Sequence, residues 1–238
     1  MRRVIQFLGF LILGAGGLAV AAEPAHGASD MPRAEDVLRR FVHRTQVPEI
    51  AEAHSAYLCT KQTVTEDFDI SGHLTNRKVR VGEACPAGGG TMDANKWGSE
   101  NGVSLDEDLL RRFEFTVAGR EQLNGRSTFH LEFVPRQPAP AIHHFQDRLL
   151  NRAMGSVWID EEDYDLAKAT ISLSEPVSFG ILGAIDAFTF AFERARADDG
   201  HWLTRWTETV FRARKFLKPI QSRKRVDWTG FRKASNAG

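Results

Sequence analysis

Apolar residues alternate with polar ones along several short segments of this chain, and this period of two constrains its fold more than any other feature. In the segment 113–118 the alternation puts one set of side chains on each face of a strand. Asn124-Gly125 follows and is a strong hairpin signal. The same spacing recurs in three sets: Phe113, Phe115, Val117; Phe129, Leu131, Phe133; and Phe188, Phe190, Phe192. The sequence therefore predicts antiparallel strands joined by tight turns.

A single amphipathic helix is expected before the strands. Its apolar residues follow helical spacing: Val37, Leu38, Phe41 and Val42. The acidic Glu35 and Asp36 favour its first turn, and the helix should end before Pro48. Roughly eight to ten strands should follow as an antiparallel meander, the last two over 201–216 and 226–232, with a further helix expected over 142–154. This order predicts an α+β protein in which β-structure dominates.

The start of the chain has the three parts of a cleavable secretory signal. Arg2 and Arg3 give a positive start, 4–20 is apolar, and 19–22 holds small residues suited to cleavage. An uncleaved membrane anchor is the alternative, but the apolar run is short for a span and no basic flank follows it. The expected parts are a signal peptide over 1–22, a flexible N-terminus over 23–30 and one domain over 31–233. With no cysteine at the cleavage site, the product should be periplasmic and not lipid-anchored.

The charge of the chain argues against one class of partner and leaves others open. It holds 31 basic and 31 acidic residues, and losing Arg2 and Arg3 with the signal leaves a net charge of about −2. Such a chain is not typical of a nucleic-acid-binding protein. The segment 201–233 is nevertheless basic, with Glu208 and Asp227 as its acidic residues. It could contact an anionic membrane surface or an envelope protein, or simply form the solvated positions of strands.

The residues that carry chemistry predict a structural bond rather than a catalytic centre. Cys59 and Cys85 are expected to form a disulfide, because an exported chain folds in an oxidising compartment. The adjacent His143-His144 would point to different sides of a helix, and the acidic run 160–165 lacks the spacing of a calcium loop and predicts a solvated turn. There is no Gly-x-Ser-x-Gly motif. We expect no catalytic residue, no metal and no cofactor.

Several stretches of the sequence carry a resemblance to a known group of proteins. In order, they are Phe113–Thr116, Leu123–Arg126, Leu131–Arg136, Gly155–Asp160, Glu175–Gly180 and Asp227–Phe231. Over about 35–232 the chain resembles the outer-membrane lipoprotein-sorting proteins of the LolA/LolB/RseB-like group. The resemblance implies a long antiparallel sheet curved into a half-open β-barrel around helices, with an apolar cavity for acyl chains or another lipid-like ligand. The cysteine pair and the 141–154 helix depart from the group's pattern, and no gating residue can be carried over.

The alternating aromatic residues are the candidate ligand-binding residues. In a solid core they would only fill space, whereas in a half-barrel some of them line a cavity. The expected lining is Phe113, Phe115, Val117, Phe129, Leu131, Phe133, Phe188, Phe190 and Phe192. We predict a monomeric periplasmic carrier or chaperone, not an enzyme, that binds a lipid-like ligand or lipoprotein. The alternative is an RseB-like regulatory sensor that docks a partner protein through 201–233.

Overall fold

The computed structural model describes residues 31–45, 57–83, 85, 110–143, 145–216 and 218–233. The helices are α1 (Ala34–Thr45) and α4 (Phe145–Leu150), and η3 (Gly180–Leu182) is a short 3₁₀ turn. The strands are β1 (Tyr57–Phe68), β2 (Leu74–Glu83), β3 (Phe113–Leu123), β4 (Arg126–Pro135), β5 (Ala153–Asp160), β6 (Leu166–Leu173), β7 (Val177–Ser178), β8 (Gly183–Arg196), β9 (Trp202–Lys215) and β10 (Lys218–Lys233). The expected signal over 1–22 and the segment 23–30 lie outside the described residues. Within the described ranges, no helix is long and apolar enough to cross a membrane.

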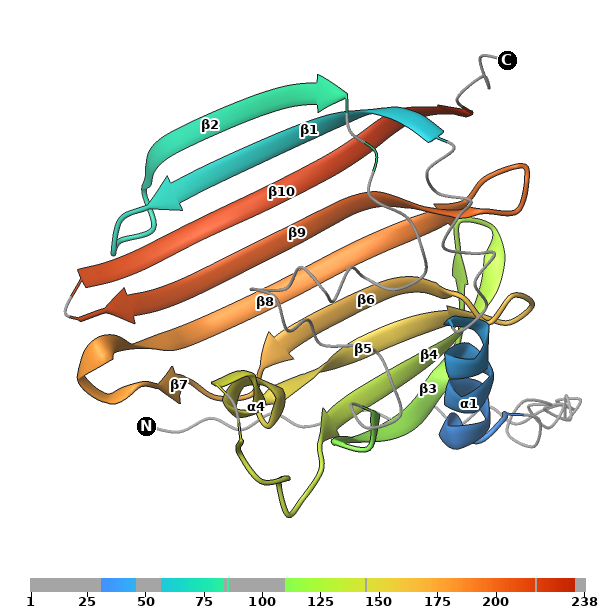
Figure 1. Ribbon diagram of the computed structural model, residues 1–238, viewed down its shortest axis with the longest axis horizontal. Coiled ribbons are helices and arrows are strands. Elements are labelled where there is room, and N and C mark those ends of the chain that lie inside the picture. The colour runs from blue at the N-terminus through green and yellow to red at the C-terminus, as the bar shows by residue number, and fades with distance from the viewer. Residues whose placement is uncertain are drawn as a thin grey trace, which may run out of the picture. The chain divides into compact units, whose positions relative to one another are not determined.

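The strands form one antiparallel sheet in the order β2-β1-β10-β9-β8-β6-β5-β4-β3, with β7 paired to β8 (Figure 1). The edges of the sheet are β2 and β3, so the sheet curves without closing into a full barrel. This confirms the expected β-dominant α+β class and the half-open sheet. A simple meander is wrong, because the β1–β2 hairpin pairs with β10 at the far side of the sheet from β3.

Helix α1 forms where the sequence predicts it. Its first turn begins at Arg33, whose carbonyl accepts the N–H groups of Asp36 and Val37 at 3.0 and 3.3 Å. Val37 and Phe41 are buried and pack against residues of β4, β5, β6 and β8. The face of the sheet that bears α1 is called the inner face here, and the opposite one the outer face. The apolar stripe of the helix therefore covers one part of the inner face.

The hairpin turn predicted at Asn124-Gly125 is confirmed. Asn124 and Gly125 have φ angles of 51° and 78°, which is the positive pair that a tight two-residue turn between β3 and β4 requires. Between β8 and β9, Gly200 has a φ of 93°. Glycine adopts this conformation without steric cost, so the residue type matches the position.

Two predicted element boundaries are wrong. The helix expected over 142–154 is confined to α4, because Ala153 already pairs with Leu173 in the ladder between β5 and β6. The last strand was expected from 226 but begins at Lys218, directly after a turn in which Phe216 has a φ of 54°. In both cases pairing with a neighbouring strand extends the sheet into residues whose local pattern is weak.

Candidate ligand-binding site

Two rows of directly paired residues cross the inner face from one edge of the sheet to the other. The first row is Val117, Leu131, Val157, Ala169, Phe192, Thr207, Val226, Thr63 and Arg80. The second row is Phe115, Phe133, Gly155, Ile171, Phe190, Thr209, Lys224, Thr65 and Lys78. Residues paired in this way project to the same face. The inner face is thus apolar from β3 to β8, carries threonines in β9, and becomes cationic towards β2.

A groove of about 580 Å³ lies at the cationic end of this face. It is lined by residues of β1, β2 and β10: Lys61, Thr63, Thr65, Asp67, Asn76, Lys78, Arg80, Val81, Gly82 and Lys224. Its volume falls within the range of ~300–1,000 Å³ typical of small-ligand sites. The amide of Asn76 donates to Asp67 Oδ2 at 3.0 Å, so the one carboxylate among the described lining residues already has a partner.

The two faces of β1, β2 and β10 differ in how their charges are balanced. On the outer face Arg77 pairs with Glu66 at 3.3 Å, and Arg223 pairs with Glu208 at 2.6 Å. Arg225 pairs with Asp227 at 2.9 Å on the same face. The groove instead gathers four cations: Lys61, Lys78, Arg80 and Lys224. No ion pair joins any of these four to another described residue, so the described part of the lining carries more positive than negative charge.

A small apolar cluster lies beside Lys61, one of the residues that line the groove. Cys59 and Cys85 form the predicted disulfide, with their Cα atoms 5.3 Å apart, and Cys59 is buried beside Val226 and Trp228. The Lys61 ammonium lies 5.8 Å from the centre of the Trp228 ring, within reach of a cation–π interaction. The bridge joins the end of β2 to β1, and so holds the two strands that supply most of the lining.

The nine predicted lining residues all project to the inner face, but they lie at its other end. Six of them are buried, namely Phe113, Phe129, Leu131, Phe133, Phe190 and Phe192. Phe115, Val117 and Phe188 are partly buried and pack against the cluster that includes α1. None of the nine lines the 580 Å³ groove. Sequence reasoning missed the groove because its strands carry Lys and Thr, although their alternation at 61, 63 and 65 was a readable signal.

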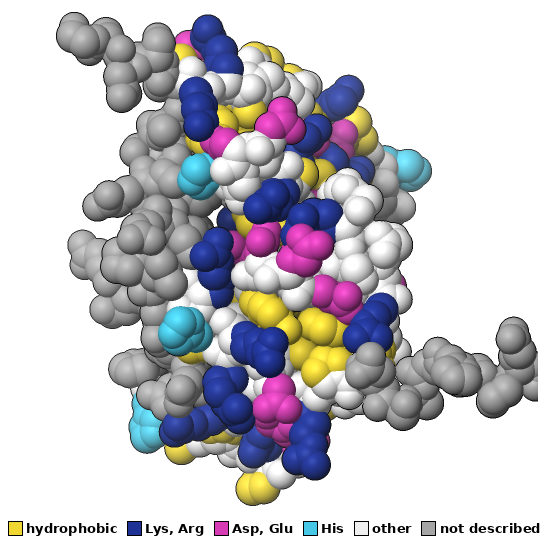
Figure 2. Space-filling view, turned by 90° about the vertical axis from the view of Figure 1, so that its right-hand side faces the viewer, with side chains coloured by type: hydrophobic (Ala, Val, Ile, Leu, Met, Phe, Trp, Pro, Cys, Tyr) yellow, Lys and Arg dark blue, Asp and Glu magenta, His cyan; other side chains and the backbone are white. Residues whose placement is uncertain are grey.

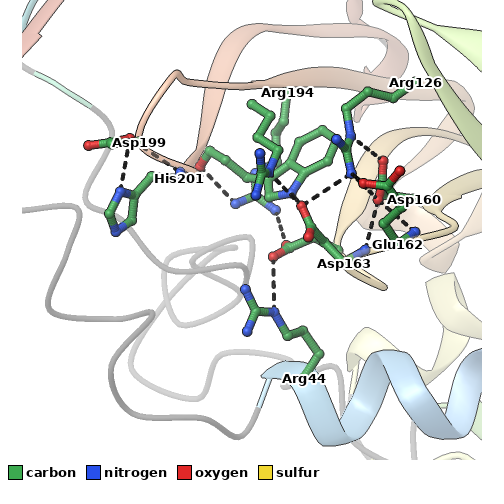
Figure 3. Close-up of polar contacts among 11 residues, drawn as sticks. Arg44, Arg126, Asp160, Glu162, Asp163, Arg194, Asp199 and His201 are labelled. Carbon is green, nitrogen blue, oxygen red and sulfur yellow. Dashed lines mark hydrogen bonds and ion pairs between the residues drawn. The ribbon is translucent and has the colours of Figure 1, made fainter.

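The acidic turn after β5 is only in part the solvated turn expected from the sequence, because Glu162 is exposed whereas Asp160 and Asp165 are buried. Asp160 is fully buried and accepts from Arg126 Nε and Nη2 at 2.6 and 2.7 Å (Figure 3). Burial alone would raise the pKa of Asp160, but the bonds from Arg126 and from the Asp163 and Glu162 backbone outweigh it and lower the pKa. Asp160 and Arg126 therefore form an internal ion pair that joins this turn to the start of β4.

A second buried pair lies next to this turn and connects it with α1. Arg194 is 5% exposed and donates to Asp165 Oδ1 at 2.7 Å and to the Trp202 carbonyl at 2.9 Å. Arg44, in the last turn of α1, approaches Asp165 Oδ2 at 3.6 Å (Figure 3). The buried carboxylate of Asp165 therefore links α1, through Arg44, with β8, through Arg194.

The basic segment 201–233 does not form a single docking face. Its residues alternate between the two faces of β9 and β10, and Arg214 pairs with Asp186 at 2.9 Å. Lys233 pairs at 2.8 Å with Asp199, whose carboxylate also accepts from the Tyr57 hydroxyl. Burial and this bond raise the pKa of Tyr57 to about 12. Figure 2 likewise shows basic and acidic side chains interspersed on the side it presents.

The described residues bring together no group of three or more side chains that could hold a metal ion. His143 is described, whereas His144 lies outside the described residues. His130 projects to the outer face, where its ring stacks on Trp158 with the ring centres 4.5 Å apart. The His130 ring therefore lies on the face of the sheet opposite to the groove.

Comparison with solved structures finds remote similarity at the level of the fold. A domain from Vibrio parahaemolyticus described as an outer membrane lipoprotein-sorting protein matches with a TM-score of 0.37 and 11% identity, over 85% of this chain and 93% of that one. A LolA superfamily protein from Nitrosomonas europaea matches with a TM-score of 0.33 and 10% identity, over 86% and 95%. MucB in the Pseudomonas aeruginosa MucA/MucB complex matches with a TM-score of 0.27 and 12% identity, over 84% and 99%. No family model and no curated protein matches the chain.

These matches include the group that the sequence resembles. At such low identity and TM-score they carry no function to this chain. The features of this chain that bear on its function are the inner face and its groove.

Proposed function

We propose that this protein is a periplasmic carrier or chaperone that holds a lipid-like ligand, such as a lipoprotein acyl chain, against the inner face of its half-open sheet. It would act by binding and not by catalysis. The observation that carries this proposal is the continuity of the inner face, which runs from a polar groove of about 580 Å³ into an apolar surface on the same sheet. A face of this kind matches a molecule that is polar at one end and apolar at the other.

A path for the apolar part of such a ligand leads from the groove across β10 and β9. Asp67 in the groove pairs with Ser222, which pairs with Phe211, and Phe211 pairs with Phe188 in β8. Phe188 and Phe211 are only half-buried. An acyl chain laid along them would approach the nine predicted lining residues, and each methylene buried there would contribute ~0.8 kcal/mol. Binding would then need few specific polar contacts.

The test is to block the groove while leaving the rest of the sheet unchanged. Thr63 projects into the groove and Gln62, its neighbour on β1, projects to the outer face and is exposed. Thr63→Trp should weaken binding of a fluorescent fatty acid by about tenfold, or ~1.4 kcal/mol, because the indole occupies the groove. Gln62→Trp adds the same side chain to the other face and should leave the affinity unchanged.

Native mass spectrometry of the protein purified from its own periplasm provides an independent measurement. The proposal expects a bound lipid in the wild type and less of it in Thr63→Trp. A ligand-free protein that also ignores the fatty acid would rule out the carrier function. Equal affinities for the two Trp variants would place the ligand somewhere other than the groove.

A further inference from the structure

The four groove cations lie on three different strands but share one face. Lys61 belongs to β1, Lys78 and Arg80 to β2, and Lys224 to β10. The strand register explains why they lie close together. Lys224 pairs with Thr65, and Thr65 pairs with Lys78. In the next inner-face row, Thr63 pairs with Arg80. The sheet therefore concentrates positive charge that the sequence spreads over more than 160 positions (Lys61 to Lys224).

This charge differs from that of Arg77, Arg223 and Arg225 on the other side of the same strands, which have acidic partners. On the outer face Glu66 is shared by Arg77 and Arg223, at 3.3 and 3.9 Å. On the groove side, Asp67 is the only carboxylate among the described lining residues, and it accepts from Asn76. A solvated strand surface would be expected to mix charges on both faces alike. Here four cations without a described acidic partner gather in the lining of one groove.

We propose that the groove binds the anionic head group of an amphiphilic ligand, with a phosphate as the best match. Lys and Arg donors form short, charge-assisted hydrogen bonds with phosphate oxygens, and the Arg80 guanidinium can bind two of them at once. The Thr63 and Thr65 hydroxyls supply neutral donors at the same wall of the groove. The acyl part of the ligand would then lie along β9 and β8. This inference rests on the proposed carrier function and adds the chemical class of the ligand to it.

The experiment compares three probes that divide the ligand into its parts. Lysophosphatidic acid with one myristoyl chain has both the phosphate and the tail, monomyristoylglycerol has the tail alone, and glycerol phosphate has the phosphate alone. Affinities are measured by isothermal titration calorimetry on the mature protein. We expect lysophosphatidic acid to bind at least about tenfold more tightly than either of the other two, because only it engages both ends of the site. Added salt should weaken its binding more than that of monomyristoylglycerol.

Charge reversal then localises the effect. Lys78→Glu with Arg80→Glu should lower the affinity for lysophosphatidic acid by about tenfold or more and change that for monomyristoylglycerol by less than about twofold. The control is Arg212→Glu with Arg232→Glu, which makes the same change in net charge at exposed positions of β9 and β10 outside the groove. Lys224→Gln, a mild change on a different strand, should weaken lysophosphatidic acid binding in the same direction and covers the case in which the double variant fails to fold.

The possible outcomes separate the two proposals. If monomyristoylglycerol binds as tightly as lysophosphatidic acid and the groove variants change neither, the head-group inference fails while the carrier function stands. The same holds if the control variant weakens binding as much as the groove variant, because the effect would then be one of net charge. If glycerol phosphate binds as tightly as lysophosphatidic acid, the groove is an anion site for a free phosphate compound and the lipid source is wrong. If none of the three probes binds, both proposals fail.

Discussion

Gly155 occupies a position on the inner face where two backbones lie too close together for any side chain. A Cβ atom built there would lie 1.9 Å from the carbonyl oxygen of Thr170 on β6. We predict that Gly155→Ala lowers the free energy of unfolding by about 1–3 kcal/mol, because the paired strands must move apart. Urea unfolding measures this difference.

The matched control for this prediction is Gly82→Ala on β2. A Cβ at Gly82 would meet no atom within 4 Å, and the change should stay within about 0.5 kcal/mol. If both alanine variants have the stability of the wild type, the close approach at Gly155 is not a constraint on the sheet. The glycine at position 155 is visible in the sequence, but its close contact with the Thr170 backbone is seen only in the structure.

The β1–β2 hairpin is the element that builds most of the groove, and it is also an edge of the sheet. All ten residues of β2 are exposed, so few buried contacts hold this strand. The Cys59–Cys85 bridge closes a loop with a sequence separation of 26 residues. In the chain-entropy account such a closure stabilises the fold by roughly 3 kcal/mol.

We therefore predict that Cys59→Ser with Cys85→Ser lowers the free energy of unfolding by roughly 3 kcal/mol and leaves the far-ultraviolet circular dichroism spectrum unchanged. The measurement is denaturant unfolding of the variant and the wild type without reductant. Dithiothreitol provides the control, since it should destabilise the wild type and leave the variant unaffected. Equal midpoints for the oxidised wild type and the variant would contradict the prediction.

At the scale of the whole molecule, Asp165 and Arg194 hold together parts of the chain that local patterns do not connect. Arg194→Met would leave the buried carboxylate of Asp165 without its closest partner. We predict a loss of about 3–5 kcal/mol in the free energy of unfolding, because the buried carboxylate would keep only its longer contact with Arg44. Thermal and urea unfolding both report this loss.

Arg196→Met is the control for this prediction, because Arg196 is only two residues away on the chain and its ion pair with Asp163 is more exposed. It should cost less than about 1 kcal/mol. Adding Asp165→Asn to Arg194→Met should restore part of the stability, since the unpaired charge is removed. Equal losses for the two Met variants, with no recovery on adding Asp165→Asn, would show that burial of the pair does not matter.

The sequence alone determined those features that depend on near neighbours along the chain. The alternation at 113–117 and 129–133, the Asn124-Gly125 turn and the apolar stripe of α1 are local patterns with a period of two or of a helical turn, and each appears in the structure. The Cys59–Cys85 pair was also predictable, because only two cysteines are present.

Only the tertiary structure decided which of these features meet. Nothing local to β1 and β2 indicates that they pair with β10, yet that pairing puts Arg80 in one row with Phe192 and Lys78 in one row with Phe190. The same is true of Asp165, whose partner Arg194 is 29 residues away. Strand order is decided by how the whole apolar surface is buried, and so the groove and its charge arise from contacts that no local period encodes.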